Sequence, residues 1–190
     1  ESSQTSSYLL VGIEHLIFGI DHVLFVMCLF LLIQSPLTLI KTITSFTLAH
    51  SITLALSVLG LVELKQGPVE AVIALSIVFL ARELLLSNPK QSSLTLTRPW
   101  LMAFFFGLLH GLGFAGALRE IGLPEDTFWS SLLLFNVGIE IGQLLVIAIL
   151  ASITWLLTKL EYKKTGILYA SWLVGMVAAY WTLDRTLLLI

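Results

Sequence analysis

The sequence predicts an all-α membrane protein, and three observations support this fold class. The chain has 190 residues, of which 57% are hydrophobic and only 12% are charged. Its mean hydropathy is +0.98. Soluble domains carry about 25% charged residues, so this chain has too little polar surface to cover a globule in water. The apolar residues also fall into long runs, which predicts one transmembrane domain over residues 1–190.

Six apolar runs are long enough to cross a bilayer, since a span needs roughly 20 mostly apolar residues. The predicted spans are about 8–33, 39–62, 68–87, 98–118, 127–158 and 166–186. Turn-forming stretches separate them, namely "QSP" (34–36), "KQGP" (65–68), "SNPKQSS" (87–93), "GLPED" (122–126) and "EYKKTG" (161–166). The fifth run exceeds the length of a span, so we expect it to tilt or project.

The positive charges predict the orientation of these spans. One side of the membrane receives Lys41, Arg82, Lys90, Arg98, Lys159, Lys163 and Lys164, and the other receives Lys65, Arg119 and Arg185. Because cytoplasmic loops carry the excess of Lys and Arg, both termini are expected on the non-cytoplasmic side of a bacterial inner membrane. The polar start "ESSQTSS" is typical of a mature N-terminus after signal-peptide removal, and equally of a native cytosolic start.

Other partners and cofactors find little support in the composition. The net charge is −2 and no basic patch is present, so no nucleic-acid partner is expected. Cys28 is the single cysteine, which excludes an internal disulfide. The expected partner is the lipid bilayer, and a homo-oligomer is compatible with the sequence.

All four histidines of the chain lie inside predicted spans. They are His15, His22, His50 and His110. A polar side chain in hydrocarbon needs a partner, so intramembrane histidines indicate a functional site. The alternative is that each histidine is a satisfied core residue.

The first span contains "GIEHLIFGIDHVLF" (12–25), in which His15 and His22 are seven residues apart and share one helix stripe. Glu14 and Asp21 form the neighbouring stripe. Seven helical residues rise roughly 10 Å, whereas metal–nitrogen bonds are about 2 Å long. The two histidines therefore bind one ion only if the helix unwinds near Gly19. Otherwise they serve two positions along a path. A further alternative is that Glu14 and His15 lie near the water interface and are merely solvated.

The second and third spans add further polar groups. Thr47, His50, Thr53 and Ser57 lie on one face of the second span, as part of a polar site or as interhelical hydrogen-bond contacts. Glu70 opens the third span, either as part of a metal path or as a first-turn acid favoured by the helix dipole.

The fourth span contains "FGLLHGLGFAGAL" (106–118), where four glycines surround His110. They are Gly107, Gly111, Gly113 and Gly116. This density of glycine predicts close helix packing or local unwinding.

The fifth span contains "FNVGIEIGQ" (135–143), which places Asn136, Glu140 and Gln143 on one face. An intramembrane glutamate must be protonated, paired or bound to a cation.

Histidine, carboxylate and amide oxygen together suit a borderline divalent ion such as Ni²⁺, Co²⁺ or Zn²⁺. Thiolate and thioether ligands form no cluster, which argues against copper(I). The predicted metal ligands are His15, Asp21, His22, His50, His110 and Glu140. The predicted supporting residues are Glu14, Thr47, Glu70, Asn136 and Gln143.

A weak internal similarity between the two halves of the sequence suggests an inverted 3+3 repeat. His22, Thr47 and His50 precede His110, Asn136 and Glu140 by 88, 89 and 90 residues. Three spans in each half would make such a repeat inverted, which is a common plan of transporters.

Five segments resemble the HupE/UreJ family of small membrane proteins. They are "HLIFGIDHVLF" (15–25), "FTLAHSITLAL" (46–56), "VEAVIALSIV" (69–78), "FGLLHGLGFA" (106–115) and "FNVGIEIGQ" (135–143). The resemblance implies a permease for nickel, or for nickel and cobalt. It also implies that the matching histidines and acids handle the metal: His15, Asp21, His22, His50, Glu70, His110 and Glu140. The second histidine-rich signature of the hydrogenase-linked branch is reduced here to His110.

The sequence therefore favours a six-helix permease for a divalent transition metal and not an enzyme. The main alternative is a membrane-embedded zinc hydrolase with three histidines on the ion and a carboxylate as general base. A structural subunit, which would bind no metal, is a third interpretation.

Overall fold

The computed structural model describes residues 2–86, 94–121 and 125–188, with the backbone alone at residues 2–6, 115–121 and 125. This part of the chain is helical and has no strand. The helices are α1 (Ser2–Phe18), α2 (Ile20–Leu32), α3 (Pro36–Val58), α4 (Gln66–Leu86), α5 (Leu94–Thr97), α6 (Pro99–Ile121), η1 (Glu125–Thr127), α7 (Phe128–Lys159) and α8 (Lys163–Leu187). The all-α prediction is confirmed.

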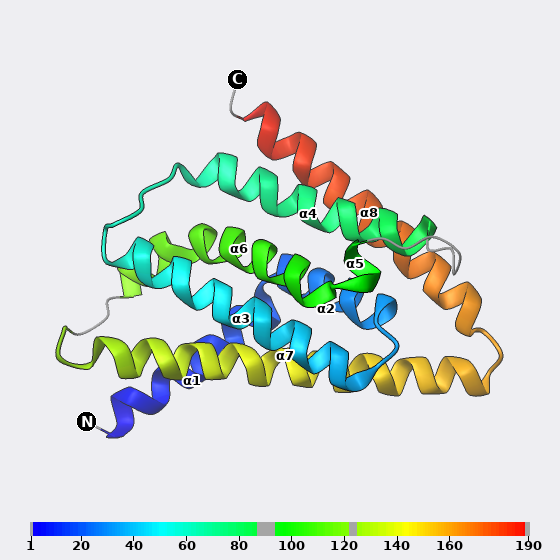
Figure 1. Cartoon of the computed structure of the whole chain (residues 1–190), viewed down its shortest axis with the longest axis horizontal. Coiled ribbons are helices and arrows are strands. Elements are labelled where there is room, and N and C mark those ends of the chain that lie inside the picture. The colour runs from blue at the N-terminus through cyan, green and yellow to red at the C-terminus, as the bar shows by residue number, and fades with distance from the viewer. Residues whose placement is uncertain (1, 87–93, 122–124, 189–190) are drawn as a thin grey trace.

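Each predicted span corresponds to a helical segment, with α1 and α2 together forming the first. Consecutive segments run in alternate directions in Figure 1. In the described part of the chain, α3, α7 and α8 are long and apolar enough to cross a membrane, and the bent α1–α2 pair makes a fourth candidate. The count of six spans stays a prediction, because the described apolar stretch of α6, Pro99–Phe114, is shorter and α4 carries Glu70, Arg82 and Glu83.

Local sequence signals explain where the second segment begins and ends. Ser35 caps α3, since its hydroxyl oxygen accepts a hydrogen bond from the Thr38 amide at 3.4 Å. Pro36 follows at the first helical position, where the missing N–H costs nothing. Beyond the end of the helix, Gly60 has φ 72°, a left-handed conformation that glycine adopts without a steric penalty.

The first segment breaks at Gly19, where the helix axis is bent by 73°. Backbone hydrogen bonds hold both sides of the break: the Gly19 amide donates to the His15 carbonyl at 2.9 Å, and the Val23 amide donates to the Gly19 carbonyl at 3.0 Å. A Cβ atom at Gly19 would lie 2.6 Å from the His15 carbonyl oxygen. The close approach therefore requires glycine, and the break removes the straight-helix separation of His15 from His22.

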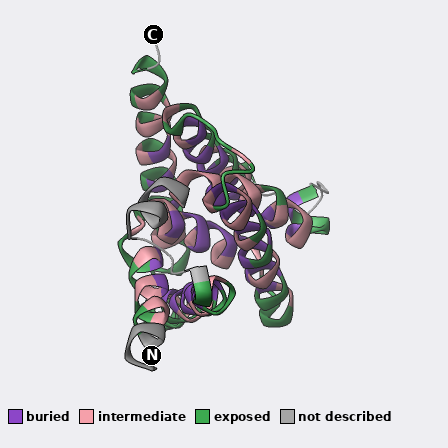
Figure 2. Cartoon of the chain, turned by 90° about the vertical axis from the view of Figure 1, so that its left-hand side faces the viewer, coloured by how far each residue is buried: buried purple, intermediate pink, exposed green. Residues whose placement is uncertain are grey.

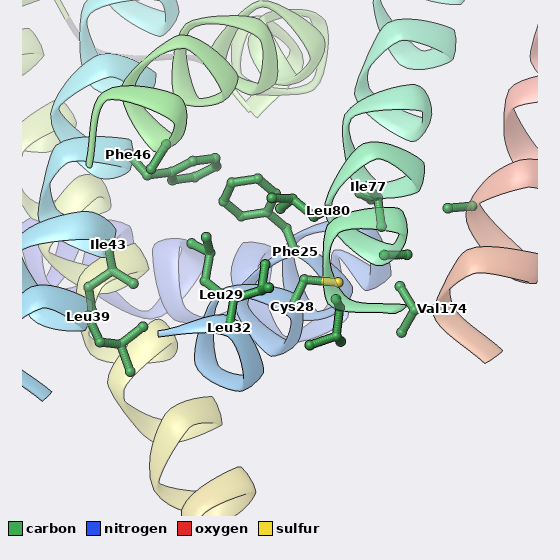
Figure 3. Packing of buried hydrophobic residues seen from close by; sticks show 14 residues of the cluster. Phe25, Cys28, Leu29, Leu32, Leu39, Ile43, Phe46, Ile77, Leu80 and Val174 are labelled. Carbon is green, nitrogen blue, oxygen red and sulfur yellow. The ribbon is translucent and has the colours of Figure 1, made fainter. Parts of the chain in front are cut away.

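Buried apolar side chains hold the segments together. Figure 3 shows Phe25, Cys28 and Leu29 of α2 between Phe46 of α3 and Leu80 of α4. A second cluster joins α1, α2, α3 and α7; its buried members are Leu16, Val26, Leu54, Leu132, Phe135, Ile139 and Val146. Figure 2 shows the buried residues facing the interior and the exposed residues on the outer sides of the helices. Many of the exposed residues are large and apolar, including Leu133, Trp155 and Trp172, as a lipid-facing surface requires.

The six segments pack mainly as three pairs: α1 with α7, α3 with α6, and α4 with α8. If the first three segments are exchanged, in order, with the last three, the same three pairs result. The α1–α7 and α3–α6 crossings rely on small residues that let the backbones approach each other closely. A Cβ atom at Gly12 would collide with the Phe135 carbonyl and lie 3.1 Å from Gly138. A Cβ atom at Gly107 would collide with the Phe46 carbonyl and lie 3.0 Å from the Ala49 side chain.

These contacts change the alignment between the two halves of the chain that the sequence suggested. Gly107 follows Gly12 by 95 residues, and Phe135 follows Phe46 by 89 residues. Matching the two crossings therefore aligns His15 with His110 and keeps Thr47 with Asn136. The sequence comparison paired His22 with His110 at an offset of 88 residues, whereas the two crossings give an offset of 95 residues between α1 and α6. The inverted repeat itself stays a prediction.

Candidate metal site

The bend at Gly19 brings the four histidines together at the centre of the molecule. His15 comes from the last turn of α1, His22 from the first turn of α2, His50 from α3 and His110 from α6. The ring centroids of His22 lie 4.7 Å from His15, 4.9 Å from His110 and 5.9 Å from His50. Residues that are 95 positions apart in the sequence thus meet around His22.

Two groups of potential metal ligands share His22. One contains His15, His22 and His50, and the other contains Asp21, His22 and His110. Within each group, one ligand atom per residue lies within 4.8 Å of the others. Donor atoms around one ion lie about 3 to 4 Å apart when metal–ligand bonds are about 2 Å long. Both groups are therefore gathered close to ligating distance.

The ring nitrogens of this cluster are buried but lack hydrogen-bond partners within the described structure. These atoms are Nε2 of His15, Nε2 of His22, and both ring nitrogens of His50 and His110. An unsatisfied buried polar atom costs about 1–3 kcal/mol, so such groups in a native fold require an explanation. Nδ1 of His22 does have a partner, the Asp21 carboxylate at 3.2 Å. The open nitrogens make this cluster suitable for a metal ion.

A cavity of about 580 Å³ leads to the histidines. Its walls come from the α1–α2 bend, the first turns of α4, the middle of α6 and the last turns of α8. His15, His22 and His110 line the cavity, whereas His50 is fully buried and does not. Three carboxylates also line it, those of Glu14, Asp21 and Glu70, and they give the cavity an acidic character that favours cations.

An ion pair closes one wall of the cavity and was missed from the sequence. Nε of Arg185 lies 3.3 Å from the Glu70 carboxylate, and the guanidinium also donates to the Glu70 carbonyl at 3.2 Å. Arg185 lies over the Trp181 ring, 5.5 Å from its centroid. The signal was available, because the start of the third span and the end of the sixth lie on the same side when spans alternate. Glu70 is therefore a cavity residue with a partner on α8.

The polar residues of the fifth span lie along a different contact. Thr44 of α3 donates a short hydrogen bond to the Glu140 carboxylate, and Thr47 donates to Gln143 at 3.1 Å. Nδ2 of Asn136 donates to the Leu132 carbonyl at 2.7 Å. We refer to Thr44, Thr47, Glu140 and Gln143 as the α3–α7 seam. Among the described residues, neither potential ligand group includes Glu140.

The structure thus gathers five of the six predicted ligands: His15, Asp21, His22, His50 and His110. It also places Glu14 and Glu70 on the cavity wall. Thr47 and Gln143 pair with each other one turn from His50, and Asn136 bonds to its own helix. Thr53 and Ser57 bond to backbone carbonyls, as expected for packing residues.

Glycine also explains how His110 reaches the centre. A Cβ atom at Gly111 would collide with the Thr53 hydroxyl and the His50 carbonyl, so α6 lies directly against α3 at this level. Gly113 faces the ends of the Ile73 and Val69 side chains and no backbone. At Gly116 only the backbone is described, as part of α6.

The cluster has the chemistry of a site for a borderline divalent cation. Neutral imidazoles and an ionised carboxylate are the ligands that Ni²⁺, Co²⁺ and Zn²⁺ accept. Aromatic rings enclose them: Phe114 lies 3.7 Å from His15, and Phe46 lies 5.1 Å from His110, between ring centroids. This apolar wall limits access by water except through the cavity.

Comparison with known proteins agrees with this chemistry. The family described as "HupE / UreJ protein" matches residues 1–185. No curated protein and no solved structure matches the chain. Membership of this family implies a metal transporter of the nickel/cobalt type in a membrane. The match covers nearly the whole chain, so the protein belongs to the HupE/UreJ family.

Proposed function

We propose that this protein transports divalent nickel, with cobalt as the next best ion, through the buried histidine cluster. The observation that carries the proposal is the convergence of four histidines, each with at least one buried and open ring nitrogen, at the end of an acidic cavity. A membrane protein gains nothing in stability from six unsatisfied ring nitrogens. A passing cation supplies the missing partners.

The cavity provides the route of entry for the ion. Glu14, Asp21 and Glu70 attract a divalent cation from water, and Asp21 and His22 lie where the cavity meets the histidines. The cavity is formed by the first turns of α4 and the last turns of α8, so it opens at the end of the bundle that carries the C-terminus. With both termini on the non-cytoplasmic side of the inner membrane, this mouth faces outward.

Flux measurements on the purified protein test the proposal. Full-length protein in proteoliposomes is expected to admit Ni²⁺ to a metal-sensitive dye inside the vesicles. His22→Ala is expected to lower the initial rate at least about 100-fold, because it removes the residue common to both ligand groups. Glu83→Gln, which changes a carboxylate at the far end of α4, is the matched control and should retain full flux.

Two results would overturn the proposal. Normal nickel and cobalt flux in His22→Ala would exclude the histidine cluster from the path. Zinc that is stoichiometric in the purified protein and resists a chelator, together with no flux, would instead favour the metallohydrolase, because a permease must release its ion.

A further inference from the structure

The two potential ligand groups cannot both hold an ion while His22 is a neutral imidazole. Both groups require this residue. A neutral imidazole has one nitrogen that carries a proton and one that has a free lone pair, so it offers one metal-binding atom at a time. The shared histidine therefore couples the two groups whichever of its nitrogens is used.

The two groups also lie at different depths. Asp21, His22 and His110 all line the cavity, so an ion held by them is in contact with the entry route. In the other group His15 and His22 also line the cavity, but the third member, His50, is fully buried and absent from the cavity wall. An ion in the first group thus lies at the cavity, and an ion in the second lies one step behind it.

Asp21 favours an exchange between the two arrangements. Its carboxylate lies 3.2 Å from Nδ1 of His22, while Nε2 of His22 is buried without a partner. When the Asp21 carboxylate accepts a hydrogen bond from Nδ1–H, the lone pair of His22 is on Nε2 and is free for an ion beside His15 and His50. When Asp21 itself binds an ion with His110, it no longer orients His22 in this way.

The helix packing also relates His15 and His110, which belong to different ligand groups. The crossing of α1 with α7 and the crossing of α3 with α6 match residue by residue, and this match aligns His15 with His110. Each of these aligned histidines pairs with His22 in a different ligand group. The two halves of the chain therefore contribute one equivalent histidine to each arrangement.

We infer that His22 serves two ion positions that exclude each other, an outer position with Asp21 and His110 and an inner position with His15 and His50. Transport passes a single ion from the outer to the inner position by exchanging the partners of His22. This inference rests on the proposed function and adds the number of ions held and the order of the ligands. The chain thus carries one ion at a time.

Equilibrium dialysis of the purified full-length protein against Ni²⁺, with element analysis, tests the inference. The wild type is expected to hold one nickel ion per chain at saturation. His50→Ala and His110→Ala are each expected to hold one ion as well, with affinity about tenfold or more below the wild type, because one position survives in each variant. Both variants should lose flux in proteoliposomes, since the transfer needs both positions. Glu83→Gln is the control and should match the wild type in both assays.

Three outcomes separate this inference from the proposed function. Two nickel ions per wild-type chain would mean that His22 bridges two ions, which overturns mutual exclusion. Loss of all nickel in both His50→Ala and His110→Ala, with native size-exclusion profiles, would mean a single site of five ligands and overturn the two positions. Neither of these results affects nickel transport itself. A wild type that neither binds nor transports nickel would overturn the proposed function.

Discussion

The histidine cluster and the α3–α7 seam are both buried polar regions of the same helix bundle, yet they differ in how their polar atoms are satisfied. In the seam, Thr44 and Thr47 donate to Glu140 and Gln143 across the helix contact. In the cluster, six ring nitrogens have no partner within the described structure. The seam uses its two hydroxyls, the Glu140 carboxylate and the Gln143 carbonyl to join two helices and leaves Nε2 of Gln143 without a partner, whereas the cluster leaves six ring nitrogens available to a ligand. Hydrogen-bond satisfaction thus separates a structural polar contact from a binding site.

Exchanging one carboxylate in each region gives the largest expected contrast. Asp21→Asn removes a charge that touches His22 and lines the cavity, so nickel flux should fall about 100-fold. Glu140→Gln keeps an acceptor for Thr44, and its flux should stay within about threefold of the wild type, as expected for a packing contact. Initial rates in proteoliposomes measure both variants.

Equal losses in Asp21→Asn and Glu140→Gln would contradict the comparison. Such losses would indicate that Glu140 takes part in metal transport, as the sequence predicted.

A change in helix spacing should affect the cluster less than the loss of a ligand does. In Gly111→Ala the new methyl group meets the His50 carbonyl and the Thr53 hydroxyl, so α6 must move away from α3. We expect nickel affinity to fall about tenfold, as for other displaced ligand supports. Gly113→Ala is the matched control, because its methyl group meets the flexible end of Ile73. Dialysis against Ni²⁺ gives both affinities, and equal affinities in the two variants would exclude His110 placement by this crossing.

The smallest expected effect is on the seam itself. Thr44→Val removes the donor to Glu140, so the free energy of unfolding should fall by about 1 kcal/mol, the scale of interhelical hydrogen bonds in membranes. Nickel affinity should remain at the wild-type value. Reversible unfolding in mixed detergent micelles reports the first quantity and dialysis the second. An unchanged stability with weakened nickel binding would reverse the roles assigned to the two regions.

Much of the fold was predictable because hydrophobic length is a local property. The boundaries of α3, α4, α7 and α8 fall close to the predicted spans, with Pro36 and Gly60 marking the ends of the second segment. The structure also brings His15, Asp21 and His22 of the first span close to the other histidines. The register of the internal repeat was not predictable in this way, because a bend of 73° lies between His15 and His22. The periodicity of apolar residues along a helix does not determine the angle of such a bend.

The sequence by itself determined which residues are expensive to bury: four histidines, Asp21 and Glu140 within apolar runs. Composition and spacing are sufficient for that conclusion, since the cost of a polar group in hydrocarbon depends on its chemistry. Only the tertiary structure decided which of these residues meet. It gathered the histidines and Asp21 at the break beside Gly19, and it satisfied Glu140 with Thr44. The physical reason is that contacts between distant segments depend on helix bends and crossings. Glycine permits such bends and close crossings, but the local pattern of residues does not specify their angles.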